Sequence, residues 1–397
     1  MKADPSFPLE TVSLATADGS YRNPFTGSAI SAEVAAEIVT HWRTLADRNR
    51  GIAVACGMAW WKRRRIAQFL WADRRPPLRF ADDAPSAIGL AGDAAIAVWP
   101  SRAPPGLSES AGDRLVRIED GFIRSIGLGA DLHPPLSIVV DQTGIYYDPT
   151  RPSDLESILA EAEFPLELCA RAESLMRTIV TRGISKYASE APIAPARPRT
   201  RRTILVPGQV EDDMSVRLGG AGITSNLDLL SRARSAEPDA HILFKPHPDV
   251  DAGHRQGRVP DARLLAYADE IVRGEAMPSL LSRVDAVHVL TSLTGFEALL
   301  RGVEVTVHGQ PFYAGWGLTR DLAPPLARRG RPLTLLQLVA GTLILYPRYL
   351  DPVTELPCPP EILLQRFAEG WRPKTTWLIR LRRWQGRIAK MFGTISR

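Results

Sequence analysis

The sequence predicts an α/β protein with two domains, and three observations lead to this expectation. Its 397 residues suffice for two domains of ordinary size, at about 100–200 residues each. Its composition, 45% hydrophobic and 23% charged, excludes a disordered, a collagen-like or a small disulfide-rich chain. Along the chain, short apolar runs alternate with helical segments, as in sheets that helices cover on both faces.

The first domain, residues 1–190, is predicted to open with a loop at 23–27. The expected elements are helices at 32–48 and 60–71, strands at 51–58, 94–99 and 115–118, and a hairpin of 137–141 with 145–147. Because strands alternate with helices, a parallel sheet is predicted.

The second domain, residues 203–350, shows the same alternation more clearly. The expected elements are strands at 203–206, 240–244, 286–290 and 303–307, and helices at 223–236, 277–283 and 294–301. Each strand ends in a loop with polar, Gly or Pro residues. In doubly wound sheets of this kind, ligands bind at the carboxyl ends of the strands.

The linker between the domains is expected at 186–202, a segment rich in Pro, Ala and Arg. A basic tail, residues 351–397, follows the second domain. Residues 371–397 hold eight basic and no acidic side chains, so the net charge of +5 belongs to the tail, and the remainder has 41 basic against 44 acidic residues. A body without a basic stripe argues against nucleic acid as a partner.

The tail carries an apolar face at helical spacing, formed by Trp377, Leu381, Trp384, Ile388 and Met391. Basic side chains occupy the other faces, which is typical of a helix lying on an anionic membrane surface. The alternative is a C-terminal helix packed on the protein's own core.

The cysteines and the apolar runs exclude several classes. Cys56, Cys169 and Cys358 are far apart and form no CxxC pair or Cys/His cluster, so neither a metal site nor a disulfide framework is expected. No signal peptide is recognised, and no uncharged apolar run reaches about 18 residues. A cytoplasmic location is the expectation.

Carboxylates follow an apolar strand in the first domain. Glu119 and Asp120 stand before a Gly turn, and Arg124 lies four residues further on. Because successive strand side chains point in opposite directions, one carboxylate is expected to face a ligand. A carboxylate there can act as nucleophile or base in glycosyl transfer, and the alternative is a turn acid that pairs with Arg124.

Two strand ends of the second domain carry candidate phosphate ligands. Lys245 and His247, each before a proline, can neutralise a phosphate or donate to a leaving group, although a rigid solvated loop is the alternative. Ser292 and Thr294 precede a helix, where hydroxyls and free amides bind phosphate. Thr294 with Glu297 also matches a capping box, which alone would mean only a capped helix.

Two further loops of the second domain remain open to alternatives. Gln209 and Glu211 contact a sugar, ribose or base in one interpretation and belong to a solvated acidic loop in the other. Gln310 opens a loop rich in aromatic residues and glycine, 310–317, which is either a packed loop that fills the domain interface or a stacking surface for a sugar or base. Glu297 and Gln310 are also counted as substrate-binding candidates.

Five segments in this order resemble the bacterial capsule polysaccharide biosynthesis family: EDGFIRSIGLGAD (119–131), VPGQVEDD (206–213), KPHPDV (245–250), TSLTGFEALLRG (291–302) and GQPFYAGWGLTRD (309–321). The resemblance runs from about residue 23 to about residue 352. It implies a fold of the glycosyltransferase-B (GT-B) type, with two Rossmann-like domains facing a central cleft. The two-domain α/β arrangement expected from the residues has this form, although fold alone does not give function.

The resemblance further implies a retaining β-Kdo transferase with CMP-Kdo as donor and no cofactor. The product would be a Kdo linker on a phospholipid-linked saccharide acceptor, made at the cytoplasmic face of the inner membrane, to which a capsule chain is attached. Asp120 matches the nucleophile position of the family's EDGF motif. The best-known members carry two such modules, whereas this chain has length for one, so other capsule assembly proteins are possible partners.

Double displacement through Asp120 is the expected mechanism, because two inversions give retention. Lys245, His247, Ser292 and Thr294 would hold the CMP phosphate. Arg124 would pair with the Kdo carboxylate.

Two rival functions remain. One is a nucleotide-sugar epimerase of the same architecture, which would isomerise its donor without an acceptor. The other is a non-catalytic capsule assembly or export module at the membrane, which would tolerate loss of Asp120.

Overall fold

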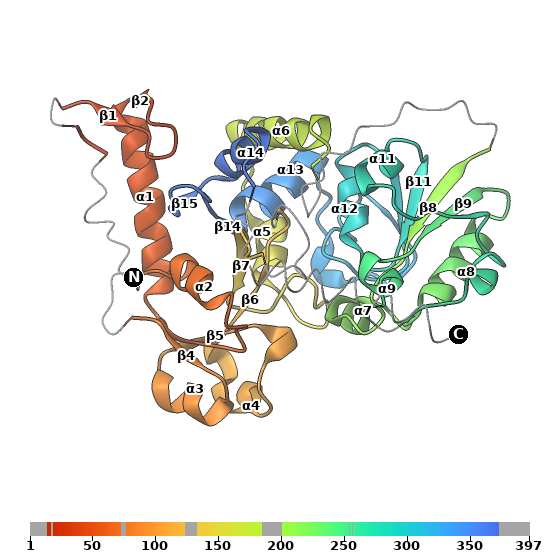
Figure 1. The fold of residues 1–397 in the computed structure, drawn as a ribbon, viewed down its shortest axis with the longest axis horizontal. Coiled ribbons are helices and arrows are strands. Elements are labelled where there is room, and N and C mark those ends of the chain that lie inside the picture. The colour runs from red at the N-terminus through yellow and green to blue at the C-terminus, as the bar shows by residue number, and fades with distance from the viewer. Residues whose placement is uncertain are drawn as a thin grey trace. The chain divides into compact units, whose positions relative to one another are not determined.

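The computed structural model describes residues 14–16, 19–72, 77–123, 133–184, 201–253, 255 and 257–372. These described residues form two compact units: those up to 143 together with 347–372 make the first, and those between 144 and 346 make the second (Figure 1). The α/β class predicted from the sequence is confirmed. The division into functional domains at 1–190, 203–350 and 351–397 stays a prediction, and the expected tail helix lies outside the described residues.

The first unit contains a seven-stranded sheet in the order β15-β14-β7-β6-β5-β3-β4. Its strands are β3 (Ile52–Cys56), β4 (Arg79–Ala81), β5 (Ala95–Val98), β6 (Leu115–Asp120), β7 (Ser137–Asp141), β14 (Pro347–Leu350) and β15 (Pro357–Cys358). Pairs among β3, β4, β5 and β6 are parallel, whereas β7 pairs antiparallel with β6 and β14, and β14 pairs antiparallel with β15. The sheet is therefore mixed, and the expectation of a parallel sheet holds for one half of it.

Helices and one small ribbon complete the first unit. They are α1 (Ala32–Asn49), α2 (Arg63–Phe69), α3 (Ala84–Ala91), α4 (Leu107–Ala111), α14 (Pro360–Ala368), and the antiparallel pair β1 (Tyr21–Arg22) and β2 (Ala29–Ile30). Ser31 caps α1 and Asp83 caps α3, each by accepting a backbone N–H. Trp42 of α1 is buried and donates its indole N–H to the Pro357 carbonyl at 2.7 Å, which ties α1 to β15.

The predicted hairpin of 137–141 with 145–147 is wrong in its second strand. β7 lies between β6 and β14, and residues 145–147 form a turn. The aromatic side chains of this turn pack against other aromatic rings. Tyr146 makes edge-to-face contacts with Tyr147, Phe312 and Tyr346, all within the second unit.

The second unit contains a six-stranded sheet in the order β10-β9-β8-β11-β12-β13, and every pair in it is parallel. Its strands are β8 (Thr203–Pro207), β9 (His241–Lys245), β10 (Glu270–Ile271), β11 (Ala286–Val289), β12 (Glu304–Val307) and β13 (Arg320–Asp321). The doubly wound topology predicted for this half has a parallel sheet of this kind, and the four predicted strands are confirmed.

The helices of the second unit follow its strands or precede the first of them. They are α5 (Asp154–Glu161), α6 (Leu166–Thr181), α7 (Met214–Gly219), α8 (Asn226–Ala236), α9 (Pro248–Asp251), α10 (Asp261–Leu264), α11 (Met277–Leu281), α12 (Leu293–Leu299) and α13 (Leu335–Val339), which continues into a π-helix, η5 (Ala340–Leu345). The core forms between this sheet and α8, where Ile204, Val206 and Leu230 are buried. In the part of the chain that the structure describes, no helix is long and apolar enough to cross a membrane.

Candidate active site

Glu119 and Asp120 are the last two residues of β6, so the strand is longer than predicted. Their side chains point to opposite faces of the sheet because strand residues alternate. Both residues are half-buried, and the Asp120 backbone N–H donates to Glu119 Oε1 at 3.0 Å. Glu119 thus turns back onto the main chain, which leaves Asp120 as the better nucleophile candidate of the two.

Lys62 lies against Asp120, and its ammonium donates to Asp120 Oδ1 at 3.3 Å. The side chains are only 11% and 16% exposed. The same ammonium lies 3.3 Å from the centroid of the Trp99 ring and 5.3 Å from that of Trp61. The charged pair therefore stands in an aromatic, water-poor environment that strengthens electrostatic interactions.

Lys62 was not among the predicted site residues, because it lies near the start of the helix predicted at 60–71. Lys62 in fact precedes α2, and it meets Asp120 across 58 positions of sequence. The one local signal is the Trp60-Trp61-Lys62 run, because a lysine that follows two tryptophans has aromatic faces within reach.

Gly121 is required directly after Asp120. A Cβ on Gly121 would lie 2.3 Å from Ser137 Oγ, and the Gly121 backbone N–H donates to the Ser137 carbonyl at 3.0 Å. This close approach fixes the chain as it leaves β6 and so positions the Asp120 side chain. Arg124, the predicted partner of the donor carboxylate, lies outside the described residues.

In the second unit, Gln209 connects two strand ends. Its Nε2 donates to Thr291 Oγ1 at 2.9 Å, and the Thr291 backbone N–H donates to Gln209 Oε1 at 2.9 Å. The amide therefore ties the loop after β8 to the loop after β11. Its role in this structure is to brace these two loops.

Glu211 lies at the start of α8. Its Oε1 accepts from the backbone N–H of Asn226 at 2.8 Å and from Asn226 Nδ2 at 3.2 Å. Ser225, the N-cap, accepts from the Asp228 backbone N–H at 3.2 Å. A carboxylate at a helix N-terminus satisfies free N–H groups and interacts favourably with the helix dipole, so Glu211 stabilises α8.

Lys245 and His247 follow β9, as predicted. Lys245 Nζ donates to the Glu275 carbonyl at 2.6 Å. Burial lowers the pKa of Lys245, and the carboxylates of Glu275 and Asp251 oppose this shift. His247 caps the short helix α9, because its Nδ1 accepts from the Asp249 backbone N–H at 3.2 Å. When neutral, His247 then carries its proton on Nε2, which makes that nitrogen the donor.

Ser292, and not Thr294, is the N-cap of α12. The helix begins at Leu293, Ser292 Oγ accepts from the Thr294 backbone N–H at 3.2 Å, and it donates to Thr294 Oγ1 at 3.1 Å. The predicted capping box of Thr294 and Glu297 is therefore wrong, because both residues lie inside the helix. Both are buried, as expected for residues that pack beneath the first turn.

The aromatic loop at 310–317 is part of the core. Phe312, Tyr313 and Trp316 are buried, and Trp316 Nε1 donates to the Phe312 carbonyl at 2.8 Å. Tyr313 donates its hydroxyl to the Ser292 carbonyl at 2.5 Å. The alternative of a stacking surface for a sugar or base is therefore wrong. The loop instead supports the turn at Ser292, which precedes α12. Gln310 Nε2 donates to the Pro324 carbonyl at 2.8 Å.

These strand ends lie against one another. The Gly208 N–H donates to the Lys245 carbonyl at 2.8 Å, and the Gln310 N–H donates to the Gly219 carbonyl at 2.8 Å. A Cβ on Gly219 would lie 3.0 Å from Thr291 Cγ2. The structure thus gathers the candidates of the second unit at the carboxyl edge of its sheet, which we call the strand-end cluster: Gln209, Lys245, His247, Ser292, Thr294 and Gln310.

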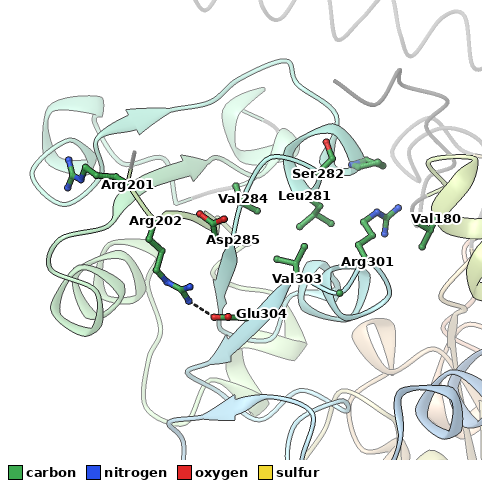
Figure 2. Close-up of a pocket in the computed structure, with 12 residues that line it drawn as sticks. Val180, Arg201, Arg202, Leu281, Ser282, Val284, Asp285, Arg301, Val303 and Glu304 are labelled. Atoms are coloured by element: carbon green, nitrogen blue, oxygen red, sulfur yellow. Dashed lines mark hydrogen bonds and ion pairs between the residues drawn. The ribbon is translucent and has the colours of Figure 1, made fainter. Parts of the chain in front are cut away.

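A cavity of about 810 Å³ lies at the other edge of this sheet (Figure 2). Among its lining residues are Arg202, Asp285 and Glu304, which stand at the amino ends of β8, β11 and β12. Arg202 and Glu304 form an ion pair at 2.5 Å. The cavity is therefore separate from the strand-end cluster. Among the described residues, no group of three or more His, Cys, Asp or Glu side chains is arranged to hold a metal ion.

Comparison with known proteins decides the family. The family model for capsule polysaccharide biosynthesis proteins matches residues 94–349. The chain belongs to this capsule polysaccharide biosynthesis family. The resemblance inferred from the five sequence segments is thereby confirmed.

Two named relatives illustrate the match within this family. The capsule polysaccharide modification protein LipA of Neisseria meningitidis serogroup A is 43% identical over 340 residues, which are 84% of this chain and 48% of LipA. The lipopolysaccharide-processing protein LpsZ of Rhizobium meliloti is 46% identical over 240 residues, 59% of this chain and 54% of LpsZ. The chain spans about half the length of the curated relatives it matches.

Two solved structures share the fold of this family member. Thermosulfurimonas dismutans KpsC, described as a β-Kdo 2,7 transferase, has a TM-score of 0.65 and 34% identity, covering 80% of this chain and 98% of the solved chain. A second structure, described as the KpsC β-Kdo 2,4 transferase, has a TM-score of 0.62 and 36% identity, covering 73% and 90%. The likeness supports the GT-B-like class expected for the sequence.

Proposed function

We propose that this protein is a glycosyltransferase that transfers Kdo from CMP-Kdo to a lipid-linked saccharide acceptor in capsule synthesis. The observation that carries this proposal is the likeness, over most of the chain, to two structures described as β-Kdo transferases. The low exposure of the Asp120–Lys62 pair at the end of β6 adds support, because buried charged groups cluster at catalytic sites.

In the proposed mechanism, Asp120 attacks the anomeric carbon C2 of Kdo. A bond forms from an Asp120 carboxylate oxygen to C2, and the bond from C2 to the phosphate oxygen breaks, so CMP leaves with the electron pair. The acceptor hydroxyl then attacks C2, the Asp120–C2 bond breaks, and the hydroxyl proton passes to water. Two inversions at C2 give net retention.

The strand-end cluster supplies the proposed donor site. Lys245 and the Nε2–H of His247 would neutralise and hydrogen-bond the CMP phosphate as it leaves, and the Ser292 and Thr294 hydroxyls would orient it. Gln310 and Glu297 are further candidates for donor binding near the same loops. Arg124 would bind the Kdo carboxylate. Gln209 and Glu211 would contact the donor only in addition to bracing their loops.

Measuring CMP release from CMP-Kdo, with and without a Kdo-terminated lipid-like acceptor, tests the proposal. The wild type is expected to release CMP in an acceptor-dependent manner and to form a β-linked product, and Asp120→Ala is expected to be inactive. Isomerised donor without CMP would indicate an epimerase. A folded wild type that turns over no donor with several acceptors would indicate a non-catalytic assembly module.

We further infer that the protein works at the cytoplasmic face of the inner membrane as a peripheral protein, where a phospholipid-linked acceptor resides. The amphipathic pattern of residues 371–397 supports an anionic membrane surface as partner. In liposome sedimentation with anionic vesicles, the full chain is expected to bind and a chain ending at residue 370 to bind less. Equal binding by both would contradict the anchor.

A further inference from the structure

The pair of Lys62 and Asp120 is more enclosed than a surface ion pair. The ammonium contacts Asp120 Oδ1 on one side and the face of Trp99 on another, and Lys62 is 9% exposed. The indole faces hold the cation through their negative π-electron density, and ring and carboxylate together limit where the ammonium can move. Lys62 therefore presents a fixed positive charge to one oxygen of the proposed nucleophile.

The proposed donor poses an electrostatic problem that ordinary sugar nucleotides do not. Kdo is a sugar acid whose carboxylate is bonded directly to the anomeric carbon, so the carbon under attack has a negative group as its neighbour. An attacking Asp120 carboxylate must approach that group closely, and at such separations like charges in a water-poor site repel strongly. A neutral sugar donor would create no such repulsion at its anomeric carbon.

We infer that Lys62 is the positioning residue that lets the Asp120 carboxylate attack the anomeric carbon of a sugar acid. This inference rests on the proposed function and deepens it. Lys62 balances the charge of Asp120 while the donor carboxylate approaches, and it orients the Asp120 carboxylate through its contact with Oδ1. When the Asp120–C2 bond breaks in the second step, the electron pair returns to a carboxylate beside the same cation.

The Trp99 contact explains why a cation can serve here without blocking attack. An ammonium held against a ring stays close to Oδ1 and is stripped of part of its water, which makes its field on Asp120 stronger. The arrangement therefore accommodates a donor with a carboxylate on its reacting carbon, where a second negative charge approaches Asp120.

Lys62→Met tests the inference, because it removes the charge and keeps most of the apolar stem. CMP release from CMP-Kdo is measured between about pH 4 and about pH 8 for wild type, Lys62→Met and Lys62→Arg. We expect kcat of Lys62→Met to fall about 100-fold and the acid limb of its pH–rate profile to move up by about one unit, since a carboxylate without its cation takes up a proton more readily. Lys62→Arg is expected to have a kcat about tenfold higher than that of Lys62→Met and to keep the acid limb of the wild-type pH–rate profile.

The matched control is Arg64→Met, which removes a cation from the first turn of α2, the helix that begins directly after Lys62. Arg64 is 69% exposed and pairs with Glu355 at 2.7 Å, away from Asp120, so its kcat and pH–rate profile are expected to match those of wild type. Thermal melting checks that each variant is folded, and Lys62→Gln replaces Lys62→Met if the latter is not.

Three outcomes overturn the inference. If the wild type is active and Lys62→Met has the same kcat and pH–rate profile, Lys62 has no positioning role, but the proposed transferase function still holds. A slow Lys62→Met whose acid limb does not move, with Lys62→Arg equally slow, indicates a merely structural lysine. A wild type that releases no CMP contradicts both this inference and the proposed function.

Discussion

At the residue scale, the contact between Gly295 and Tyr313 shows how one missing side chain shapes the Ser292 turn. A Cβ at position 295 would lie 2.3 Å from Tyr313 Oη and 2.7 Å from its Cζ. Because Tyr313 is fully buried, its ring cannot move aside without disturbing its neighbours. We expect Gly295→Ala to lower the free energy of unfolding by about 2 kcal/mol, measured by urea denaturation.

Gly89→Ala is the matched control for this substitution. Gly89 is also a helical glycine, in α3, and nothing lies within 4 Å of the Cβ it would gain. This change is expected to raise the free energy of unfolding by about 0.5–1 kcal/mol, because alanine favours the helix. Equal stability of Gly295→Ala and wild type would contradict the packing argument.

His288 and His308 form a buried pair, with His288 Nδ1 and His308 Nε2 3.0 Å apart. Burial, aided by the charges of His308, Arg320 and Arg202, lowers the pKa of His288 to about 3. Burial also lowers the pKa of His308 to about 4, with Arg232 and Arg320 acting in the same direction. Both rings are therefore neutral in the folded protein at neutral pH.

This pair predicts a loss of stability in acid. Below the ordinary histidine pKa of 6.5 the unfolded chain binds protons that the folded chain does not, so stability falls as the pH drops through that value. Because of this pair, we expect the free energy of unfolding to fall by about 3 kcal/mol between about pH 7 and about pH 5, measured by urea denaturation. A double variant, His288→Gln with His308→Gln, should show a correspondingly smaller pH dependence. The same pH dependence in both proteins would disprove this origin.

Sequence reasoning at this scale located residue types better than their partners. It placed Asp120 and Lys245 at strand ends, where the structure has them, because an apolar run followed by a polar residue marks such an end. It chose the wrong cap for α12, since Ser292 and Thr294 are both of residue types preferred at N-caps and only Thr294 has a Glu three residues later; the backbone conformation makes Ser292 the cap. It missed Lys62, whose contact with Asp120 exists only in three dimensions.

At the scale of elements, α8 depends on an acceptor outside itself. Glu211 Oε1 accepts from both nitrogens of Asn226, a residue that is only 7% exposed. We expect Glu211→Ala to lower the free energy of unfolding by about 1–3 kcal/mol, because it leaves these donors without their carboxylate. Glu211→Gln retains an amide oxygen and should lose less.

The same two variants separate bracing from donor contact. Urea denaturation gives their stability, and CMP release at varied CMP-Kdo concentration gives KM. If Glu211→Ala has the free energy of unfolding of the wild type but a raised KM for CMP-Kdo, Glu211 binds the donor directly and its contact with α8 contributes little to stability.

Elements of the second unit were predicted within a few residues, because β8, β9, β11 and β12 are short apolar runs buried in a parallel sheet. Near the end of β7, the apolar residues at 145 and 147 suggested a second strand that does not exist. Ile145 and Tyr147 are buried, but in a turn, and alternating apolar residues report burial and not backbone pairing. Nothing in their local pattern distinguishes the two.

At the scale of the whole molecule, the sheet of the first unit is completed by residues from beyond the second unit. β14 pairs with β7, and the buried Asp351 that follows β14 pairs with Arg366 of α14 at 2.9 Å. Burial opposes ionisation of Asp351, but hydrogen bonds from Arg366 and Thr354 outweigh it and lower the pKa of this carboxyl. This ion pair joins β14 to α14.

Truncation tests this dependence. A chain ending at Tyr346 loses β14, β15 and α14, which exposes an edge of β7 and the apolar side chains beneath α14, and we expect it to be insoluble or to lose cooperative thermal unfolding. A chain ending at Arg372 keeps all seven strands and is expected to unfold cooperatively, as followed by circular dichroism. A soluble, cooperatively folded 1–346 chain would show that the first unit does not need these elements.

The return of the chain at Pro347 also sets an order of events during synthesis. A ribosome releases β3 to β7 early, but their partner β14 follows only after the whole of the second unit has been made. The described residues of the second unit all lie between 144 and 346, so this part can fold as soon as it emerges, whereas the first unit must wait with one edge of β7 unpaired. The pairing of β7 with β14 closes a loop of some two hundred residues, a contact that slows folding. The half of the protein that carries Asp120 is thus made first and finished last, and in that interval it is the half most in need of a chaperone.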